Sequence, residues 1–222
     1  MKNLLLLSFT ILFKTTIYAQ PVKYETRATD ITTFDTFDLR DEVLEGTSYI
    51  QNEFLLANIE NYDKPVFLKY NAFQDQMEII RDKIYFIPKK IGLSITFKET
   101  NFTYKVFSFE VKNNNNLVFL KVLQDGLRIV LLLQEKIIFV EETKPKTGYK
   151  EYEAPRLKRI KDKLFYSKEN NIALEMPKNK KDILSIFSNN LLEVKSFVKT
   201  NKLNIKNKKD LIKVVEYYNT LR

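Results

Sequence analysis

Four polar residues in one short stretch carry the side chains best suited to chemistry: Tyr70, Asn71, Asp75 and Glu78. They flank a predicted hairpin turn, so their polar groups are expected to converge. Two carboxylates there could act as a paired acid and base, or could hold a hard cation such as calcium. A structural interpretation competes, because Asn71 and Asp75 are common turn residues and Glu78 would face solvent. The structural interpretation is favoured. The four residues are therefore ligand-binding candidates, and neither a catalytic residue nor a metal site is predicted.

The absence of two residue types narrows the chemistry further. The chain of 222 residues contains no Cys and no His, which excludes thiol nucleophiles, His general bases and His-ligated zinc sites. Its four glycines form no phosphate-binding fingerprint, and no Gly-x-Ser-x-Gly elbow is present. The sequence therefore predicts no cofactor and favours a protein that is not an enzyme. A carboxylate-dependent hydrolase of cell-surface polysaccharide, with Asp75 and Glu78 as its acid pair, is the alternative.

The chain carries 37 basic and 28 acidic residues, and some of the basic residues form three clusters. The clusters are Lys158-Arg159-Lys161-Lys163, Lys178-Lys180-Lys181 and Lys206-Lys208-Lys209. Basic clusters beside helices can bind nucleic acid, but lysines at helix starts suit solvent exposure, and export keeps a protein away from nucleic acid. Nucleic acid is therefore not the expected partner. An anionic polymer or lipid is the alternative ligand.

Two further groups of residues have both a functional and a structural interpretation. Acidic residues near the N-terminus could bind calcium, but they lack the spacing and the glycine of a known calcium loop, and a solvated lead-in is favoured. These acids are Asp30, Asp35, Asp38, Asp41 and Glu42. Tyr149 and Tyr152 could stack on sugars. The chain has no Trp, however, and most of its aromatic residues are expected in the core and the sheet.

Short strands are the elements that would position these residues. Apolar runs rich in Val, Ile, Leu, Phe and Tyr are separated by turn residues, which is the pattern of consecutive hairpins. The predicted strands span residues 53–60, 65–71, 77–81, 83–88, 93–99, 103–112, 117–124, 127–134 and 136–142, with two more near 163–168 and 172–175. With no helix between them, they predict an antiparallel β meander, a curled or barrel-like sheet that hides its edges.

Two turns and two strands carry more specific signals. Asp125-Gly126 between apolar runs predicts a two-residue type I′ hairpin, in which both residues take positive φ. Residues 113–116, all Asn, predict a longer hairpin loop. Alternation in 103–111 predicts a core face made by Phe107, Phe109 and Val111, and a second face made by Tyr104, Val106, Ser108 and Glu110. The run 129–133 is apolar throughout and predicts a strand that is covered on both faces.

After Pro177 the apolar pattern takes a helical period, and the mainly β chain acquires an α appendage. Three segments begin with Asn and carry an acid three residues later, which is typical of a capped helix start. They start at Asn179, Asn190 and Asn207. The pattern predicts a small C-terminal bundle of three short helices near 180–188, 191–200 and 208–220, packed together or on the sheet.

The first residues of the chain predict export. Lys2 opens a basic head, the run from residue 4 to residue 13 is mostly apolar, and Ile17-Tyr18-Ala19 resembles a cleavage site. The apolar run is too short to span a membrane, so we expect cleavage after Ala19, no transmembrane span afterwards, and a periplasmic or secreted protein. The expected divisions are a signal peptide (1–19), an irregular lead-in (20–46), an antiparallel β domain (47–176) and a helical segment (177–222).

Two stretches carry a family resemblance: residues 68–79, and the tail from Pro177 to Tyr218. They resemble an uncharacterised group of exported proteins from Bacteroidota, in particular flavobacterium-like lineages. The group has no established activity, so the resemblance implies a bacterial envelope setting and transfers no catalytic residue. Together with the excluded chemistries, it predicts a non-enzymatic binding or structural component of a Gram-negative envelope, whose partner is an envelope protein or a glycan.

Overall fold

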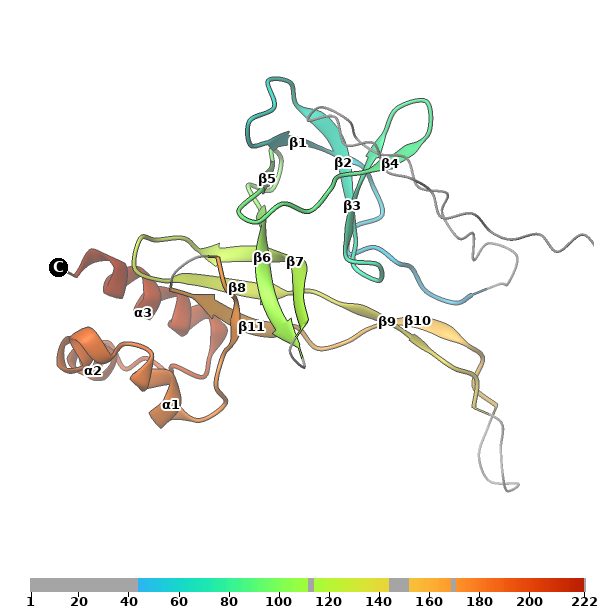
Figure 1. Ribbon diagram of the computed structural model, residues 1–222. Coiled ribbons are helices and arrows are strands. Elements are labelled where there is room, and N and C mark those ends of the chain that lie inside the picture. The colour runs from blue at the N-terminus through green and yellow to red at the C-terminus, as the bar shows by residue number, and fades with distance from the viewer. Residues whose placement is uncertain (1–43, 112–113, 144–151, 169–170, 222) are drawn as a thin grey trace, which may run out of the picture. The chain divides into compact units, whose positions relative to one another are not determined.

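The computed structural model describes residues 44–111, 114–143, 152–168 and 171–221, all within one unit of the chain, Ile31–Arg222 (Figure 1). The predicted signal peptide and almost all of the predicted lead-in, including the acids from Asp30 to Glu42, lie outside these residues. Tyr149 also lies outside them.

The fold is mainly β, as predicted, with three α-helices near the C-terminus. Ten strands form one antiparallel sheet in the order β12-β11-β8-β7-β6-β5-β1-β2-β3-β4, and β9 and β10 form a separate two-stranded ribbon. The strands are β1 (Leu55–Ile59), β2 (Val66–Asn71), β3 (Gln76–Ile80), β4 (Ile84–Phe86), β5 (Ser94–Phe97), β6 (Thr103–Val111), β7 (Asn114–Gln124), β8 (Val130–Gln134), β9 (Ile137–Val140), β10 (Arg156–Arg159), β11 (Lys163–Ser167) and β12 (Leu174–Glu175).

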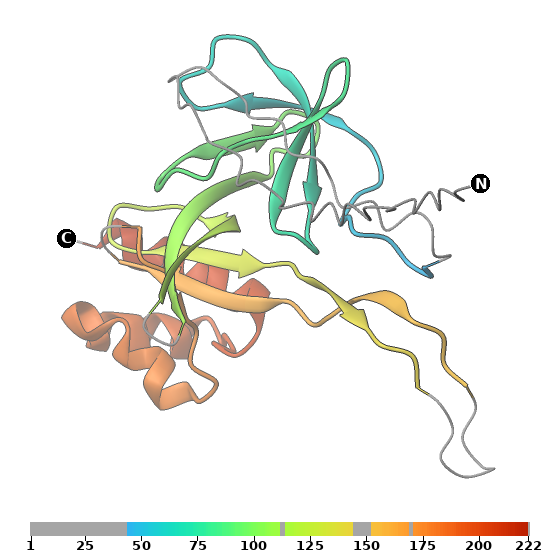
Figure 2. The same ribbon diagram turned by 45° about the vertical axis from the view of Figure 1, so that its right-hand side comes forward.

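Three apolar clusters hold this sheet together. The first lies on the inner face of the curled strands β1 to β6 and includes Leu68, Met77 and Phe97. The second joins the helices to β8 and β11, and the third includes Phe107 and Phe165. The third cluster is enclosed because the segment after β11 returns to β6: the Ser108 amide donates to the Asn171 carbonyl at 2.8 Å, and the Ala173 amide donates to the Ser108 carbonyl at 2.8 Å. In Figure 2 the curled strands, coloured cyan to green, lie above the C-terminal helices, coloured orange and red.

Both faces of β6 are buried in its central part, which corrects one prediction. Tyr104 and Val106 belong to the first cluster, whereas Phe107 belongs to the third. The second predicted face, opposite the predicted core face, is covered because the sheet curls over it. The prediction for β8 is confirmed, since Leu131 contacts the helices and Leu132 lies in the third cluster.

The sequence did not reveal strand β10, which pairs with β9 from Arg156↔Val140 to Arg159↔Ile137. Its residues are Arg-Leu-Lys-Arg, so only Leu157 gives an apolar signal. That residue packs against the first cluster, and its amide donates to the Glu45 carbonyl at 2.8 Å. The β9–β10 ribbon is visible at the right of Figure 1.

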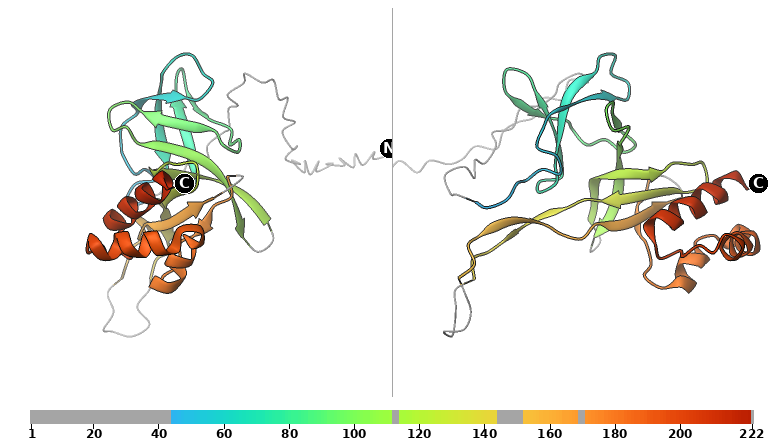
Figure 3. Two further views of the ribbon diagram at one scale, coloured as in Figure 1. Left: turned by 90° about the vertical axis from the view of Figure 1, so that its left-hand side faces the viewer. Right: turned by 180° about the vertical axis from the view of Figure 1, so that it is seen from behind.

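The C-terminal helices are close to the prediction. They are α1 (Lys180–Ser185), α2 (Leu191–Thr200) and α3 (Lys208–Thr220), with a 3-10 turn at Ser188–Asn190 before α2 (Figure 3). Asn179 caps α1 and Asn207 caps α3 through side-chain hydrogen bonds. The third cap prediction is wrong: Asn190 makes no capping bond, because the 3-10 turn leads directly into α2 and leaves its Oδ1 buried without a hydrogen-bond partner.

Both predicted hairpin turns differ from the structure. Neither Asp125 nor Gly126 has positive φ, so the type I′ prediction is wrong, although β7 and β8 do pair. Gly126 is needed instead for a close approach, because a Cβ there would lie 2.0 Å from Nδ2 of Asn219 in α3. Within residues 113–116, the described Asn114–Asn116 belong to β7 and pair with β6, so this part of the predicted loop is strand.

Candidate functional site

The four candidate residues lie on the β2–β3 hairpin but form two separate hydrogen-bonded pairs. Tyr70 donates to Asp75 Oδ1 at 2.9 Å, and Asn71 donates through Nδ2 to Glu78 Oε1 at 2.8 Å. The register explains the separation: Tyr70 is opposite Met77 and Lys69 is opposite Glu78, so Tyr70 and Glu78 point to opposite faces of the sheet. The hairpin therefore does not present its two carboxylates to a common space.

Asp75 occupies the hairpin turn, as predicted, with φ of 55°. Its carboxylate accepts from Lys89 Nζ at 2.5 Å, from the Tyr70 hydroxyl and from the Phe119 amide at 3.2 Å. Burial raises the pKa of Asp75, and the Lys89 ammonium and these hydrogen bonds oppose the increase. The pKa of the Tyr70 hydroxyl is raised well above its usual value, first by burial and then by the Asp75 carboxylate. This carboxylate ties the hairpin to β7.

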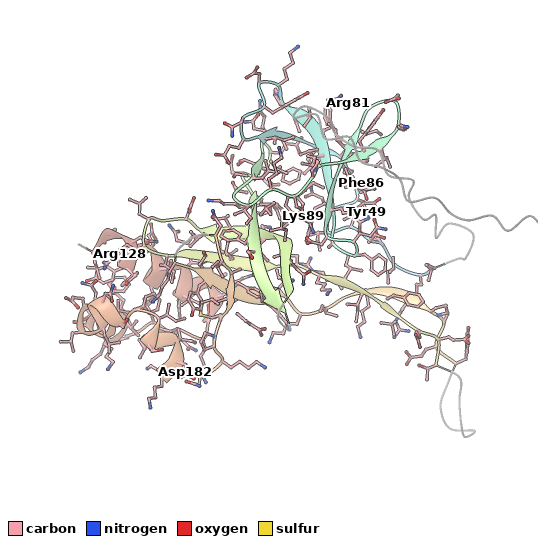
Figure 4. The ribbon with its side chains drawn as sticks, viewed as in Figure 1. Tyr49, Arg81, Phe86, Lys89, Arg128 and Asp182 are labelled. Atoms are coloured by element: carbon pink, nitrogen blue, oxygen red, sulfur yellow. The ribbon has the colours of Figure 1, made fainter. Side chains whose placement is uncertain are left out.

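Glu78 does not face solvent, which corrects the structural interpretation at that residue. Its exposed fraction is 2%, and it accepts hydrogen bonds from Asn71 and from the Tyr49 hydroxyl at 2.9 Å. Lys69 lies next to it, with Nζ 3.5 Å from the centre of the Tyr49 ring. In Figure 4, Lys89 lies to one side of β3, and Tyr49 and Phe86 lie to the other. The segment before β1 therefore covers Glu78.

Asn71 confirms the turn interpretation, because its Oδ1 accepts from the Gln74 amide at 3.0 Å while its Nδ2 donates to Glu78. All four candidates thus have internal hydrogen-bond partners. Within the described residues, there is no group of three acidic, Cys or His side chains placed to hold a metal ion.

A second buried carboxylate, Glu135, was not recognised from the sequence. It is 5% exposed and accepts from the Tyr104 hydroxyl at 2.5 Å and from Arg159 Nη2 at 2.9 Å. Lys121 Nζ lies 3.8 Å from its Oε2. Burial raises the pKa of the Tyr104 hydroxyl, and the neighbouring carboxylate raises it further. A charged residue between the apolar runs of β8 and β9 was the available signal, because a charge at such a position needs a partner.

The Asp75 and Glu135 networks meet through aromatic rings. The Tyr70 and Tyr104 ring centres are 4.9 Å apart, so the hydroxyl that binds Asp75 and the hydroxyl that binds Glu135 belong to neighbouring rings. Asp75 accepts from β2, β7 and the segment after β4, and Glu135 accepts from β6 and β10. Such an arrangement suits cross-linking of the sheet better than proton transfer to a ligand.

An accessible groove lies elsewhere, between the strands and the helices. Its volume is about 740 Å³, and it is bordered by β8, β11, the segment after β12 and the starts of α1 and α3. Leu133, Ile183 and Leu211 contribute apolar side chains to it. Five lysines also line it: Lys161, Lys163, Lys178, Lys206 and Lys208. The groove combines an apolar floor with charged groups, as ligand sites commonly do.

Tyr152, one of the two tyrosines considered for sugar stacking, is 56% exposed, and its hydroxyl donates to Glu142 at 3.2 Å. Among the described helices, none combines the length and apolar character needed to cross a membrane. No protein-family model, curated protein or solved structure matches the chain.

Proposed function

We propose that this chain is a non-enzymatic binding component of a Gram-negative cell envelope, exported through the inner membrane and located in the periplasm or outside the cell. The observation that carries the proposal is the groove of about 740 Å³ between the sheet and the helices, which is open to solvent and lined by charged and apolar side chains. A groove of that volume falls within the range of small-molecule and headgroup sites. The expected partner is an envelope glycan, lipid or protein.

The state of the acidic residues supports a binding role over hydrolysis. Asp75 is bonded to Lys89 and Tyr70, and Glu78 is enclosed with Asn71 and Tyr49. A glycoside hydrolase needs two carboxyl groups that flank one bond of the substrate. Side chains on opposite faces of a hairpin do not supply that geometry.

The test is affinity purification of the tagged chain from gently cross-linked native envelopes, followed by mass spectrometry of the eluted protein and lipid fractions. We expect a stoichiometric envelope component that is absent from a tag-only control. Turnover of an envelope polysaccharide by the parent chain, lost in Asp75→Asn or Glu78→Gln variants that still fold, would contradict the proposal and favour the hydrolase.

A further inference from the structure

Three basic clusters that are far apart in the sequence meet at the same groove. Lys161 and Lys163 come from the first cluster, Lys178 comes from the second, and Lys206 and Lys208 come from the third. The meander and the helices bring them together, because β11 leads into the segment before α1, and α3 returns to the sheet. The convergence is a property of the tertiary structure, and the sequence shows only separate basic runs.

The groove carries an excess of positive charge. Two acidic residues line it, Asp162 and Glu175, so five positive and two negative side chains leave a net charge of +3. Both acids already have partners: Asp162 Oδ1 is 3.0 Å from Arg159 Nη2, and Glu175 Oε2 is 3.7 Å from Lys163 Nζ. The other four lysines have no ion-pair partner among the described residues. Four cationic groups are thus available to a ligand.

The helix dipole and the neighbouring positive charges both disfavour cations in this part of the fold. Lys208 is the first residue of α3, at the positive end of the helix dipole. Burial lowers the pKa of the nearby Lys121 ammonium; Glu135 opposes this effect, whereas Arg159 and Lys208 add to it. Positive charges therefore repel one another across this region. Such a breach of local preference is characteristic of a functional site.

We propose that the groove binds a ligand that carries one or more phosphate groups. The inference rests on the proposed binding function and names the chemistry of its ligand. Four free ammonium groups border a groove of about 740 Å³, and a compact anion suits such a site. A phosphate monoester supplies about 1.5 to 2 negative charges with three acceptor oxygens. Lysine is suited to this role as a point charge. A polymer with scattered carboxylates would neutralise fewer of these lysines within the same volume.

The test measures binding of two probes to the purified full chain. The first probe is inorganic tripolyphosphate, whose binding is measured by calorimetry. The second probe is a phosphatidylcholine vesicle, prepared with and without phosphatidic acid, whose binding is measured by co-sedimentation of the protein. One variant replaces Lys178, Lys206 and Lys208 by Gln. Its control replaces Lys64, Lys90 and Lys98 by Gln, which removes the same charge from exposed lysines that do not line the groove. All six side chains are exposed, so both variants should retain the unfolding midpoint of the parent.

We expect the groove variant to bind at least about tenfold more weakly than the parent, while the control changes less than about twofold. Binding of tripolyphosphate alone would assign a free phosphorylated molecule, and binding of phosphatidic acid vesicles alone would assign a lipid headgroup; either supports the site. Equal loss in both variants would overturn it, because the attraction would then belong to the whole surface. So would a parent that binds neither probe, or one that prefers single-stranded DNA to both. The proposed envelope-binding function would still hold after such a result if the groove variant recovers the cross-linked envelope partner.

Discussion

Replacing Glu135 by Gln removes the charge from a carboxylate that is 5% exposed and has three donors around it. Gln keeps the shape and one acceptor oxygen, but it leaves Arg159 and Lys121 near a neutral group. Removal of one partner from a fully buried ion pair costs about 3–5 kcal/mol. Arg159 is 46% exposed, so water screens part of that loss. We therefore expect a decrease of about 2–3 kcal/mol in the free energy of unfolding.

The measurement is urea unfolding of the parent and of Glu135→Gln at neutral pH, with the slope of each transition compared to verify that the same surface is exposed. Glu99→Gln is the matched control, because Glu99 is exposed; its effect should stay within about 0.5 kcal/mol. A loss in Glu135→Gln no larger than in the control would refute the role assigned to the network.

A double-mutant cycle separates the ion pairs from the Tyr104 bond. Tyr104→Phe keeps the ring in the first apolar cluster and removes only the hydroxyl that donates to Glu135 at 2.5 Å. We expect a loss of about 1–2 kcal/mol. The double variant with Glu135→Gln should lose less than the sum of the two single losses, because both substitutions disrupt one hydrogen bond. Strict additivity would show that this bond contributes nothing measurable.

Three further outcomes are expected. Asn207→Ala should lose about 1 kcal/mol of unfolding free energy in urea, because it removes the cap of α3, whereas Asn190→Ala should be neutral or stabilising, because its Oδ1 has no partner. Gly126→Ala should destabilise the chain in thermal unfolding, because its Cβ would collide with the Asn219 side chain. The same substitution should cost much less when it is made in an Asn219→Ala chain and compared with Asn219→Ala alone. Asp75 has a raised pKa in the folded chain. The parent should therefore lose stability relative to Asp75→Asn as the pH rises from the unfolded pKa of about 4 through the folded pKa. If the difference in unfolding free energy between the two proteins is the same at acidic and neutral pH, the raised pKa of Asp75 is contradicted.

Local sequence signals predicted the elements of this fold well. In the part of the chain that the structure describes, apolar runs and turn residues predicted eleven of the twelve strands and all three α-helices, because each signal depends on residues close in sequence. The same signals failed where a distant segment intervenes. Asp125-Gly126 has the composition of a tight turn, but the Asn219 side chain binds the Arg128 and Ile129 amides at 3.2 and 3.1 Å and holds a longer loop. Composition cannot report a contact that forms 90 residues away.

The candidate site shows the same limit. The sequence identified the turn roles of Asn71 and Asp75, which depend on the hairpin itself. The sequence predicted that Glu78 faces solvent, because the alternation of residues along a strand assigns a side chain to one face of the sheet but does not show what covers that face. Tyr49 covers it from a segment outside the hairpin. The basic clusters were equally visible in the sequence, but their convergence on one groove depends on how α3 returns to the sheet.

The tyrosines explain how a chain without Cys ties its segments together. A buried tyrosine hydroxyl needs a hydrogen-bond partner, and in this fold that partner is repeatedly a carboxylate. Two of these bonds join residues 29 and 31 positions apart, and both end on a buried Glu. The pairs are Tyr49–Glu78, Tyr70–Asp75, Tyr85–Asp82, Tyr104–Glu135 and Tyr152–Glu142. The two acids first considered for catalysis, Asp75 and Glu78, are therefore held by tyrosines of the same chain, and Tyr152, first considered for sugar stacking, binds Glu142.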